Sequence, residues 1–497
     1  MADEFDVAVV GGGGAGLMAA HAAASLGRRV VVLEKRLELG GTTAMSVGTI
    51  CTSSTAHQRR AGIADSPDAH FEDMGKFPGV SADRDNLALR RVLVDNVPEA
   101  FRVLVELGAE FLGPIAEPPH RVPRLHAIVP HSRGYIRALW RAGRRAGVMF
   151  RTRAPVRRLI LERGRVGGVE IAASGGAELI GARCVIVASG DFSSADRSFK
   201  ARFMRDPLLA IGGINPASTG DGQRLGEAAG GEIVNGDLAW GPEIRFVAPA
   251  RAKLVSRLPP WRLLAKLISV AMRTLPEKIL RPLLMSYATT YLAPSHNLFR
   301  EGAVLVNAVG ARFCDELDRP QDRIGEEAGQ QAFILFDRNV AAKFDAWPNF
   351  ISTAPGVGYA YLADYRRSRR DVCFEAGDWE ELARATGLPA GALAATISAH
   401  NAQCGAGGRP PLERPPFFAL GPAKSWIVFT EGGLRVDERL QVLTRKGAPI
   451  PGLYAAGSAG QGGLLLEGHG HHLGWAFTSG LLAGRHAAEE AGANLAA

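Results

Sequence analysis

The stretch DVAVVGGGGAG, residues 6–16, joins an apolar strand pattern to a run of glycines, and an alanine-rich helical pattern follows its last glycine. Gly11, Gly13 and Gly16 have the G-x-G-x-x-G spacing. In this context Gly11 makes the strand-to-helix turn, Gly13 lets a pyrophosphate approach the backbone, and Gly16 lets the helix lie close to the strand. The stretch therefore predicts that a helix N-terminus faces the phosphates of a dinucleotide.

A second strand pattern at residues 29–33 ends at Glu34, whose carboxylate can accept hydrogen bonds from a ribose diol. Strand, helix, strand and acid thus follow one another at the intervals of a dinucleotide-binding unit. A glycine-rich loop that binds nothing would not require this register. The sequence predicts an α/β fold with a Rossmann-like domain.

Composition narrows the class of protein. The chain has 497 residues, of which 46% are apolar and 22% are charged, which is typical of a globular protein of two or three domains. Its five cysteines form no C-x-x-C pair, which argues against iron–sulfur, zinc-ribbon, haem-attachment and disulfide frameworks. The acidic N-terminus leads directly into the first strand, so we expect no signal peptide, no transmembrane span and a cytoplasmic protein.

The net charge of +8 is concentrated in one segment. Residues 251–281 hold eight basic side chains and one acid, a local balance of +7. No RNA-binding signature accompanies them, so no nucleic-acid partner is expected. Apolar residues surround this basic stripe over residues 251–285, which predicts peripheral contact with anionic lipid at the inner face of a membrane. The alternative is a cap helix packed on its own domain or on a second subunit.

Nucleotide-type turns occur at both ends of the chain. After the first turn come VASG at 187–190 and TGDG at 219–222, and GLYAAG at 452–457 precedes a helical pattern at 474–488. The dinucleotide domain is therefore expected to be discontinuous, with parts at 1–240 and 426–497. Residues 241–425 are expected to form an inserted capping domain.

These motifs in this order resemble the flavoprotein superfamily of soluble fumarate reductases and 3-ketosteroid dehydrogenases. The resemblance extends over nearly the whole chain and also rests on GGTT at 40–43, EGAVLVN at 301–307 and GARF at 310–313. It implies a glutathione-reductase-type FAD-binding domain with an inserted α+β capping domain that closes over the isoalloxazine. It also implies hydride transfer between flavin N5 and a carbon next to, or conjugated with, a carbonyl or carboxylate.

The same resemblance implies a non-covalent FAD, because no histidine or cysteine stands in the loop at 40–48 to tether it. The implied FAD-binding residues lie in the first turn, the loop after Glu34 and the later glycine turns. They are Gly11, Gly13, Gly14, Ala15, Gly16, Glu34, Lys35, Gly41, Thr42, Thr43, Ser46, Val156, Ala188, Ser189, Gly190, Asp221, Gly457, Ser458 and Leu473. Because there is a single G-x-G-x-x-G, we expect the second electron partner either to use the same pocket or to be an external electron acceptor or donor.

Departures from the family pattern bear on the substrate. Where fumarate reductases have His-Thr-x-Gly-Gly and Asn-Arg-Leu-Gly-Gly, this chain has FTEGG at 429–433 and HHLGW at 471–475. Phe429 and Trp475 would make the site apolar, and Glu431 would repel a dicarboxylate. We therefore expect a lipophilic ketone or enone, ketosteroid-like or terpenoid-like, as the substrate. The alternatives are fumarate-type reduction of a small unsaturated carboxylate and a non-enzymatic flavin redox sensor.

The ketosteroid dehydrogenases resemble the chain at residues 473–480, but their catalytic tyrosine falls near Leu466. The proton-transferring group is therefore sought in LLLEGHGHH, residues 464–472. Its glycines do not suit the spacing of metal ligands, so we expect no metal. The candidates in this loop are Glu467, His469, His471 and His472, with the amide of Gly470 as a carbonyl-binding group.

Three further candidates lie in the insertion. Arg319 falls one residue short of the proton-donating arginine of fumarate reductases, and a solvated surface arginine is the alternative. Tyr287 and Tyr291 offer phenols from the cap, and packing tyrosines are the alternative.

Overall fold

The computed structural model describes residues 4–77, 79, 82–173, 176–249, 254–354, 358–404 and 409–496. Arg251 and Lys253 of the basic segment lie outside the described residues.

A parallel sheet forms the centre of the first domain. β1 pairs in parallel with β2 on one side and β9 on the other, and β9 in turn pairs in parallel with β23. The order is β22-β23-β9-β1-β2-β6, so strands far apart in the sequence are neighbours. The Rossmann-like α/β prediction is thus confirmed. The bounds are β1 Glu4–Val10, β2 Val30–Leu33, β6 Met149–Arg151, β9 Gly176–Val187, β22 Gln441–Leu443 and β23 Pro449–Ala455.

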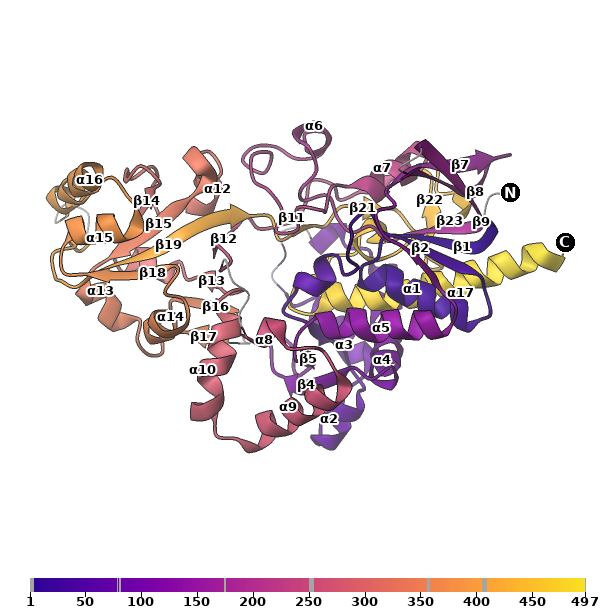
Figure 1. Ribbon diagram of the computed structural model, residues 1–497, viewed down its shortest axis with the longest axis horizontal. Coiled ribbons are helices and arrows are strands. Elements are labelled where there is room, and N and C mark those ends of the chain that lie inside the picture. Colours follow the sequence, from indigo (N-terminus) through magenta and orange to yellow (C-terminus); the bar gives the residue numbers. More distant parts are fainter. Residues whose placement is uncertain are drawn as a thin grey trace.

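Two helices from opposite ends of the chain lie together on this sheet. α1 (Gly14–Ser25) packs along α17 (His471–Ala496), and α5 (Arg133–Arg145) lies beside α1 (Figure 1). The approach is close because a side chain at Gly480 or Gly484 would clash with the backbone of α1. The C-terminal segment therefore completes the domain that the N-terminal segment begins.

The remaining elements of this domain surround the sheet. A hairpin of β7 and β8 extends it through β9, and a small sheet of order β3-β5-β4 lies near α17. The strands are β3 Thr49–Cys51, β4 Glu110–Ile115, β5 Leu125–Val129, β7 Val156–Glu162 and β8 Arg165–Ala173. The helices are α2 Ala56–Arg60, α3 Pro67–Met74, α4 Leu87–Glu106, α6 Arg197–Lys200 and α7 Asp221–Ala228, with 3-10 turns at Thr42–Met45, Ala82–Arg84 and Gly457–Gly460.

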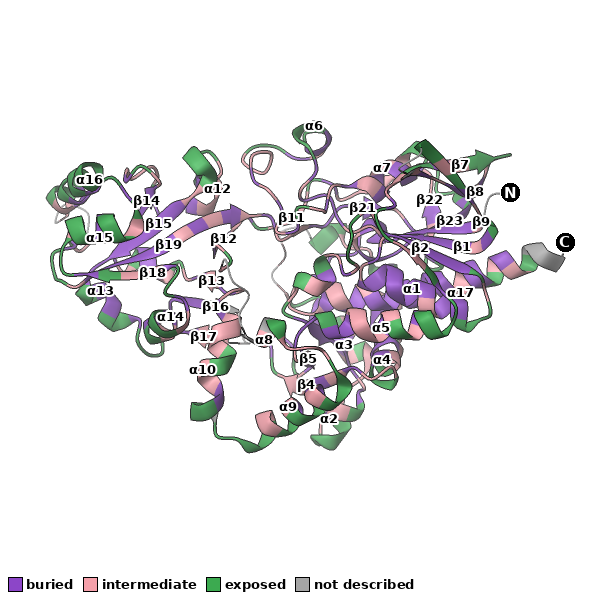
Figure 2. Cartoon of the chain, in the orientation of Figure 1, coloured by how far each residue is buried: buried purple, intermediate pink, exposed green. Residues whose placement is uncertain are grey.

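The inserted region has its own core. An antiparallel sheet of order β12-β19-β15-β14, with β18 on β19, carries a hydrophobic cluster separate from that of the first domain. Figure 2 shows the two buried interiors apart. Its strands are β12 Glu243–Phe246, β13 Ala293–Pro294, β14 Val304–Asn307, β15 Ala332–Phe336, β16 Ser352–Ala354, β17 Gly358–Ala360, β18 Cys373–Ala376 and β19 Phe417–Trp426. Its helices are α8 Leu254–Arg257, α9 Arg262–Thr274, α10 Glu277–Ala288, α11 Asn297–Arg300, α12 Pro320–Ile324, α13 Arg338–Lys343, α14 Leu362–Ser368, α15 Trp379–Thr386 and α16 Ala390–Gln403, with a 3-10 turn at Ala328–Gln330.

Short antiparallel pairs link the two regions. β10 (Ile233–Val234) pairs with β21 (Gly433–Leu434), and β11 (Ala239–Trp240) pairs with β20 (Phe429–Thr430). We propose to place the domain division at these pairs, near residues 240 and 426.

A helical arm, α9 and α10, makes a second connection. α9 packs on β4 and β5 of the first domain, whereas α10 packs on α14 and β17 of the insertion (Figure 1). The described part of the basic segment thus contains α8 and the two helices of the arm, which are separated at Leu275 and Pro276. One face of α9 is buried at Ala265 and Ser269, so α9 packs on the protein along that face.

Candidate functional site

The first glycine turn has the geometry of a phosphate cradle. Gly11 adopts φ +110°, a conformation that favours glycine, and a Cβ there would meet the carbonyl of Ala188. Gly16 lies against the carbonyl of Gly11, so only glycine fits there too. A Cβ at Gly13 would meet nothing nearer than the Gly40 oxygen, 4.0 Å away. The turn is therefore open at Gly13, where a pyrophosphate would approach.

Glu34 lies beside this opening at the carboxyl end of β2. Its buried carboxylate accepts hydrogen bonds from the amides of Gly12 at 2.8 Å and Arg36 at 2.9 Å. These bonds fix the carboxylate next to the turn while each oxygen keeps a lone pair for a ribose hydroxyl.

Small polar residues form the facing wall. Thr43 Oγ1 accepts from the Gly14 amide at 3.2 Å, Ser46 Oγ donates to the Thr43 carbonyl, and Thr42 Oγ1 accepts from Asn215 Nδ2 at 2.8 Å. Gly41 has φ +50° and lies against Gly13. The wall therefore leaves backbone and hydroxyl groups close to the cradle.

Two other expected FAD ligands already bind each other. Lys35 Nζ donates to Asp221 Oδ2 at 2.8 Å and to Thr219 Oγ1 at 2.6 Å. This ion pair joins the end of β2 to the start of α7. Ser189 Oγ, in contrast, is buried with no hydrogen-bond partner among the described residues. A buried hydroxyl that lacks a hydrogen-bond partner beside the glycine turn is consistent with a polar cofactor that would supply the partner.

The other expected FAD-binding positions extend this surface along the sheet. Val156 begins β7, and Ala15 lies in the first turn of α1. Ala188 and Gly190 flank Ser189 after β9. Leu473 lies at the start of α17, and Gly457, with φ +61°, and Ser458 lie in the turn after β23.

His472, Phe429 and Glu431, which the sequence suggested for the substrate side, lie close together. His472 stands in the first turn of α17, its ring 3.5 Å from that of Phe429 between centroids. Its Nε2 lies 3.6 Å from Glu431 Oε1 and has no hydrogen-bond partner among the described residues. Glu431 is buried and also accepts from Gln461 Nε2. Glu431 is thus held in place beside the imidazole.

Two sequence-based expectations near this site need correction. His471 and His472 belong to α17, which starts three residues earlier than residue 474, so they are not in a flexible loop. Trp475 is fully buried and its Nε1 donates to the Gly457 carbonyl at 3.2 Å, so it packs in the core rather than lining a substrate site. Trp240, whose ring lies 5.6 Å from Phe429, is the aromatic neighbour that the sequence did not reveal.

The remaining loop candidates have structural partners. His469 pairs through Nδ1 with Glu117, and its amide donates to the same carboxylate. Burial raises the pKa of Glu467, and the charges of Glu431 and Asp85 raise it further. Gly470 has φ +83° and its carbonyl accepts from the Cys51 amide at 3.2 Å.

His471 lies in a buried cluster with residues from three other segments. Its Nε2 is 3.1 Å from His70 Nε2, and the thiol of Cys51 lies 3.5 Å from His70 Nε2 and 3.3 Å from His120 Nε2. The prediction that no metal is bound rests on the spacing of residues 464–472 alone, without ligands from other segments. The fold brings four potential ligand atoms within 4.8 Å of one another.

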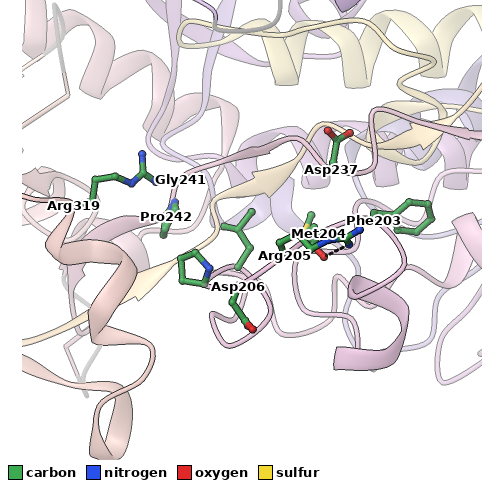
Figure 3. A pocket seen from close by; sticks show the side chains of 10 residues that line it. Phe203, Met204, Arg205, Asp206, Asp237, Gly241, Pro242 and Arg319 are labelled. Atoms are coloured by element: carbon green, nitrogen blue, oxygen red, sulfur yellow. Dashed lines mark hydrogen bonds between the residues drawn. The ribbon is translucent and has the colours of Figure 1, made fainter.

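The cap candidates have contacts with neighbouring residues of the cap. Arg319, at φ +47°, has a side chain 65% exposed and pairs with Asp322 Oδ2 at 2.5 Å. It lines a cavity of about 270 Å³ with residues 203–208, Asp237 and Pro242 (Figure 3). Tyr287 and Tyr291 contact each other at 5.0 Å between ring centroids, and burial raises the pKa of Tyr287.

Comparison with known proteins agrees with this architecture. The FAD binding domain family matches residues 6–253 and 288–465. A probable fumarate reductase of Shewanella frigidimarina is 27% identical over 505 residues, covering 98% of this chain and 74% of that protein. A 3-oxosteroid 1-dehydrogenase of Mycobacterium tuberculosis is 26% identical over 613 residues, covering 98% of this chain and 99% of that protein.

Among solved structures, the open conformation of a flavocytochrome c3 fumarate reductase superposes with a TM-score of 0.73 at 24% identity, covering 98% of this chain and 79% of that one. The fold, the glycine cradle and these matches confirm the sequence-based resemblance and the FAD cofactor. The chain belongs to the FAD binding domain family and is an FAD-dependent oxidoreductase.

Proposed function

We propose that this flavoenzyme transfers a hydride between flavin N5 and a C–C or C=C bond next to the carbonyl of a lipophilic ketone or enone, ketosteroid-like or terpenoid-like. The observation that carries the proposal is the group of Phe429, His472 and Glu431. Phe429 replaces the histidine, and His472 the arginine, with which fumarate reductases hold substrate carboxylates.

Electrostatics at this group disfavour a dicarboxylate. Even if His472 were protonated, Glu431 at 3.6 Å would offset its charge, so the pair presents little net positive charge to an anion. A substrate carboxylate against Phe429 would also lose its hydration without gaining a cation, which costs several kcal/mol at the order-of-magnitude level. A ketone loses much less on the same transfer.

The aromatic contacts suit an apolar ring system. Phe429 packs against the imidazole of His472 and lies near the ring of Trp240. The three rings come from α17, β20 and β11, and the last two form the strand pair next to the domain connection. An apolar substrate would be held where the cap meets the FAD-binding domain.

His472 is the group we assign to proton transfer. Its Nε2 lacks a hydrogen-bond partner in the described structure, whereas His469 and His471 are engaged by Glu117 and by the buried cluster. Glu431 stabilises the imidazolium form when the ring takes up a proton. His472 therefore holds or delivers the proton that accompanies hydride transfer at flavin N5.

The bound FAD supplies the hydride-accepting and hydride-donating ring. We propose that Gly11, Gly13 and the start of α1 hold its pyrophosphate, Glu34 its ribose, and the 41–46 wall its flavin end. The electrons then pass to or from an external carrier, since the chain has one G-x-G-x-x-G turn in strand–helix context.

The test is anaerobic flavin spectroscopy with matched substrates. A 3-ketosteroid should reduce the oxidised flavin, or its unsaturated analogue should reoxidise the reduced flavin, while fumarate should leave the reduced flavin unchanged. The double variant Phe429→His with His472→Arg should gain reoxidation by fumarate and lose the ketosteroid response. Rapid reoxidation of the wild-type flavin by fumarate would refute the proposal in favour of a small-carboxylate reductase, and no response to either compound class would favour a redox sensor.

We also propose that the α9–α10 arm contacts anionic membranes. Large apolar side chains are exposed on it and directly before it, among them Trp261, Leu263, Leu267 and Ile279. No helix in the described part of the chain is long and apolar enough to cross a membrane. The contact would be peripheral and would place a lipophilic substrate near the domain connection.

A further inference from the structure

The cluster of Cys51, His70, His120 and His471 is built from four separate segments. Cys51 ends β3, His70 lies in α3, His120 follows β4, and His471 is the first residue of α17. All four are buried. No part of the proposed hydride or proton transfer uses them.

Their nitrogen and sulfur atoms converge on one point. The three measured separations are 3.1 Å between His70 and His471 Nε2, 3.3 Å from Cys51 Sγ to His120 Nε2, and 3.5 Å from Cys51 Sγ to His70 Nε2. Tetrahedral zinc with Zn–N of about 2.0 Å and Zn–S of about 2.3 Å places its ligand atoms about 3.3–3.6 Å apart. The cluster therefore has nearly the dimensions of a tetrahedral site before any ion is considered.

The environment of His471 and His70 also suits a metal. His471 Nδ1 donates to the Glu467 carbonyl, which leaves the Nε2 lone pair directed into the cluster, the usual arrangement of a metal-binding histidine. His70 Nδ1 has no hydrogen-bond partner among the described residues.

Zinc binds cysteine as the thiolate, and the ion would offset the cost of burying that charge.

We infer that Cys51, His70, His120 and His471 bind one zinc ion as a closed, tetrahedral structural site. Binding releases one proton from the Cys51 thiol and changes no oxidation state. The ion ties β3, α3 and the turn after β4 to the first turn of α17. It thereby fixes the backbone next to His472.

The hydrogen bond between Arg124 and His120 must break when zinc binds. Arg124 Nη1 lies 2.9 Å from His120 Nδ1, so in the metal-free cluster it donates to this nitrogen and His120 Nε2 carries the proton toward Cys51. On binding, the His120 proton moves to Nδ1 and Arg124 Nη1 turns away. We assign Asp73, which already accepts from Arg124 Nη1, as the acceptor of the hydrogen bond from His120 Nδ1–H in the zinc-bound site.

The experiment uses full-length, FAD-loaded protein without a histidine tag, exposed to zinc and then freed of loosely bound metal. We expect about one zinc per flavin by elemental analysis, and an X-ray absorption spectrum with one sulfur at about 2.3 Å and three nitrogens at about 2.0–2.1 Å. Less than about a tenth of a zinc per chain, or a first shell without sulfur, would overturn the inference. Neither readout depends on the substrate, so failure of the proposed function would not affect it.

Matched variants locate the site. Cys51→Ser and His70→Gln should each weaken zinc affinity roughly hundredfold or more, whereas Cys184→Ser and His400→Gln, which alter a buried thiol and imidazole elsewhere, should not change it. If the ligand variants do not fold, the sulfur in the wild-type spectrum remains decisive. An unchanged affinity in His120→Gln would overturn the four-ligand assignment, and an at least tenfold loss would support it.

Discussion

At the scale of single residues, Glu34 shows how one carboxylate serves both the fold and the cofactor. It accepts amide hydrogen bonds from Gly12 and Arg36, so the strand end and the glycine turn are fixed together. Glu34→Ala should lower FAD affinity from several-fold to a hundredfold, because a charge-assisted ribose contact is worth about 1–3 kcal/mol.

Titration of the apoprotein by flavin fluorescence measures this change, and Glu34→Gln, which keeps one acceptor oxygen, should give an intermediate loss. Equal affinity in all three proteins would show that Glu34 is not the ribose acceptor. Acid precipitation should release all of the flavin as FAD, since no residue of the loop at 40–48 can tether it.

His472 is the second residue whose role can be measured directly. His472→Ala should slow flavin reduction or oxidation by a responsive ketone by roughly 10²–10⁴-fold while FAD stays bound, the range expected of a positioned acid–base group. Anaerobic stopped-flow spectroscopy gives the rate, with His469→Ala as the control because its imidazole is paired with Glu117. A wild-type rate in His472→Ala would transfer the proton-transfer role to Arg319 or the cap tyrosines.

At the scale of elements, the α9–α10 arm carries both exposed cations and exposed apolar side chains. Lys266, Arg273 and Lys278 are exposed, whereas Arg281 is engaged by Asp364 at 2.7 Å. Neutralising the three exposed cations should weaken binding to anionic vesicles roughly hundredfold, because each contributes about 1 kcal/mol near the surface.

Vesicle co-sedimentation at low and physiological salt provides the measurement, and the wild-type signal should fall steeply between the two conditions. Neutral vesicles and the Leu263→Ser variant separate the electrostatic from the apolar contribution. Equal recovery of wild-type protein in the supernatant with and without anionic lipid would leave the arm as a structural link between the domains.

Elements with local signals could be predicted from the sequence, and contacts between distant segments could not. The βαβ turn and the hairpin at Arg163 and Gly164 follow from strand periodicity and glycine placement. The start of α17 was placed three residues late because glycines at 468 and 470 resemble a loop. The position at which α17 starts determines which of its side chains face the core, and Trp475 is one of them.

The buried cluster shows why contacts between distant segments could not be predicted from the sequence. Cys51, His70, His120 and His471 have no spacing motif, since each comes from a different segment. Only the packing of β3, α3 and α17 brings their side chains together. His472, its immediate neighbour in sequence, could be recognised because the family pattern marks that position.

At the scale of the whole molecule, buried neutral histidines make the fold sensitive to acid. Burial, together with the smaller effect of the nearby charge of His57, lowers the pKa of His126 from 6.5 to about 4. The unfolded chain therefore binds more protons than the folded one between pH 6.5 and 4, and stability is lost as the pH falls through this window. At pH 5 the loss from this ring is about 2 kcal/mol.

Thermal unfolding followed by circular dichroism at pH 7 and pH 5 tests this expectation. The midpoint of the wild type should fall on acidification, and that of His126→Gln should fall by less, since glutamine does not titrate. His126 Nδ1 donates to the Arg124 carbonyl and Nε2 lies 3.0 Å from Thr55 Oγ1, so the variant should also be less stable at pH 7. An identical acid shift in both proteins would assign the effect to other groups.

The pairing of α1 with α17 also has a consequence for biosynthesis. The ribosome makes β1, the glycine turn and α1 before the insertion, and it makes the helix that covers α1 after the insertion. Until α17 is made, the apolar surface of α1 lacks its partner, while the insertion can already close around its own core. We therefore expect FAD to be held firmly only once α17 has left the ribosome, when the cap can already have folded.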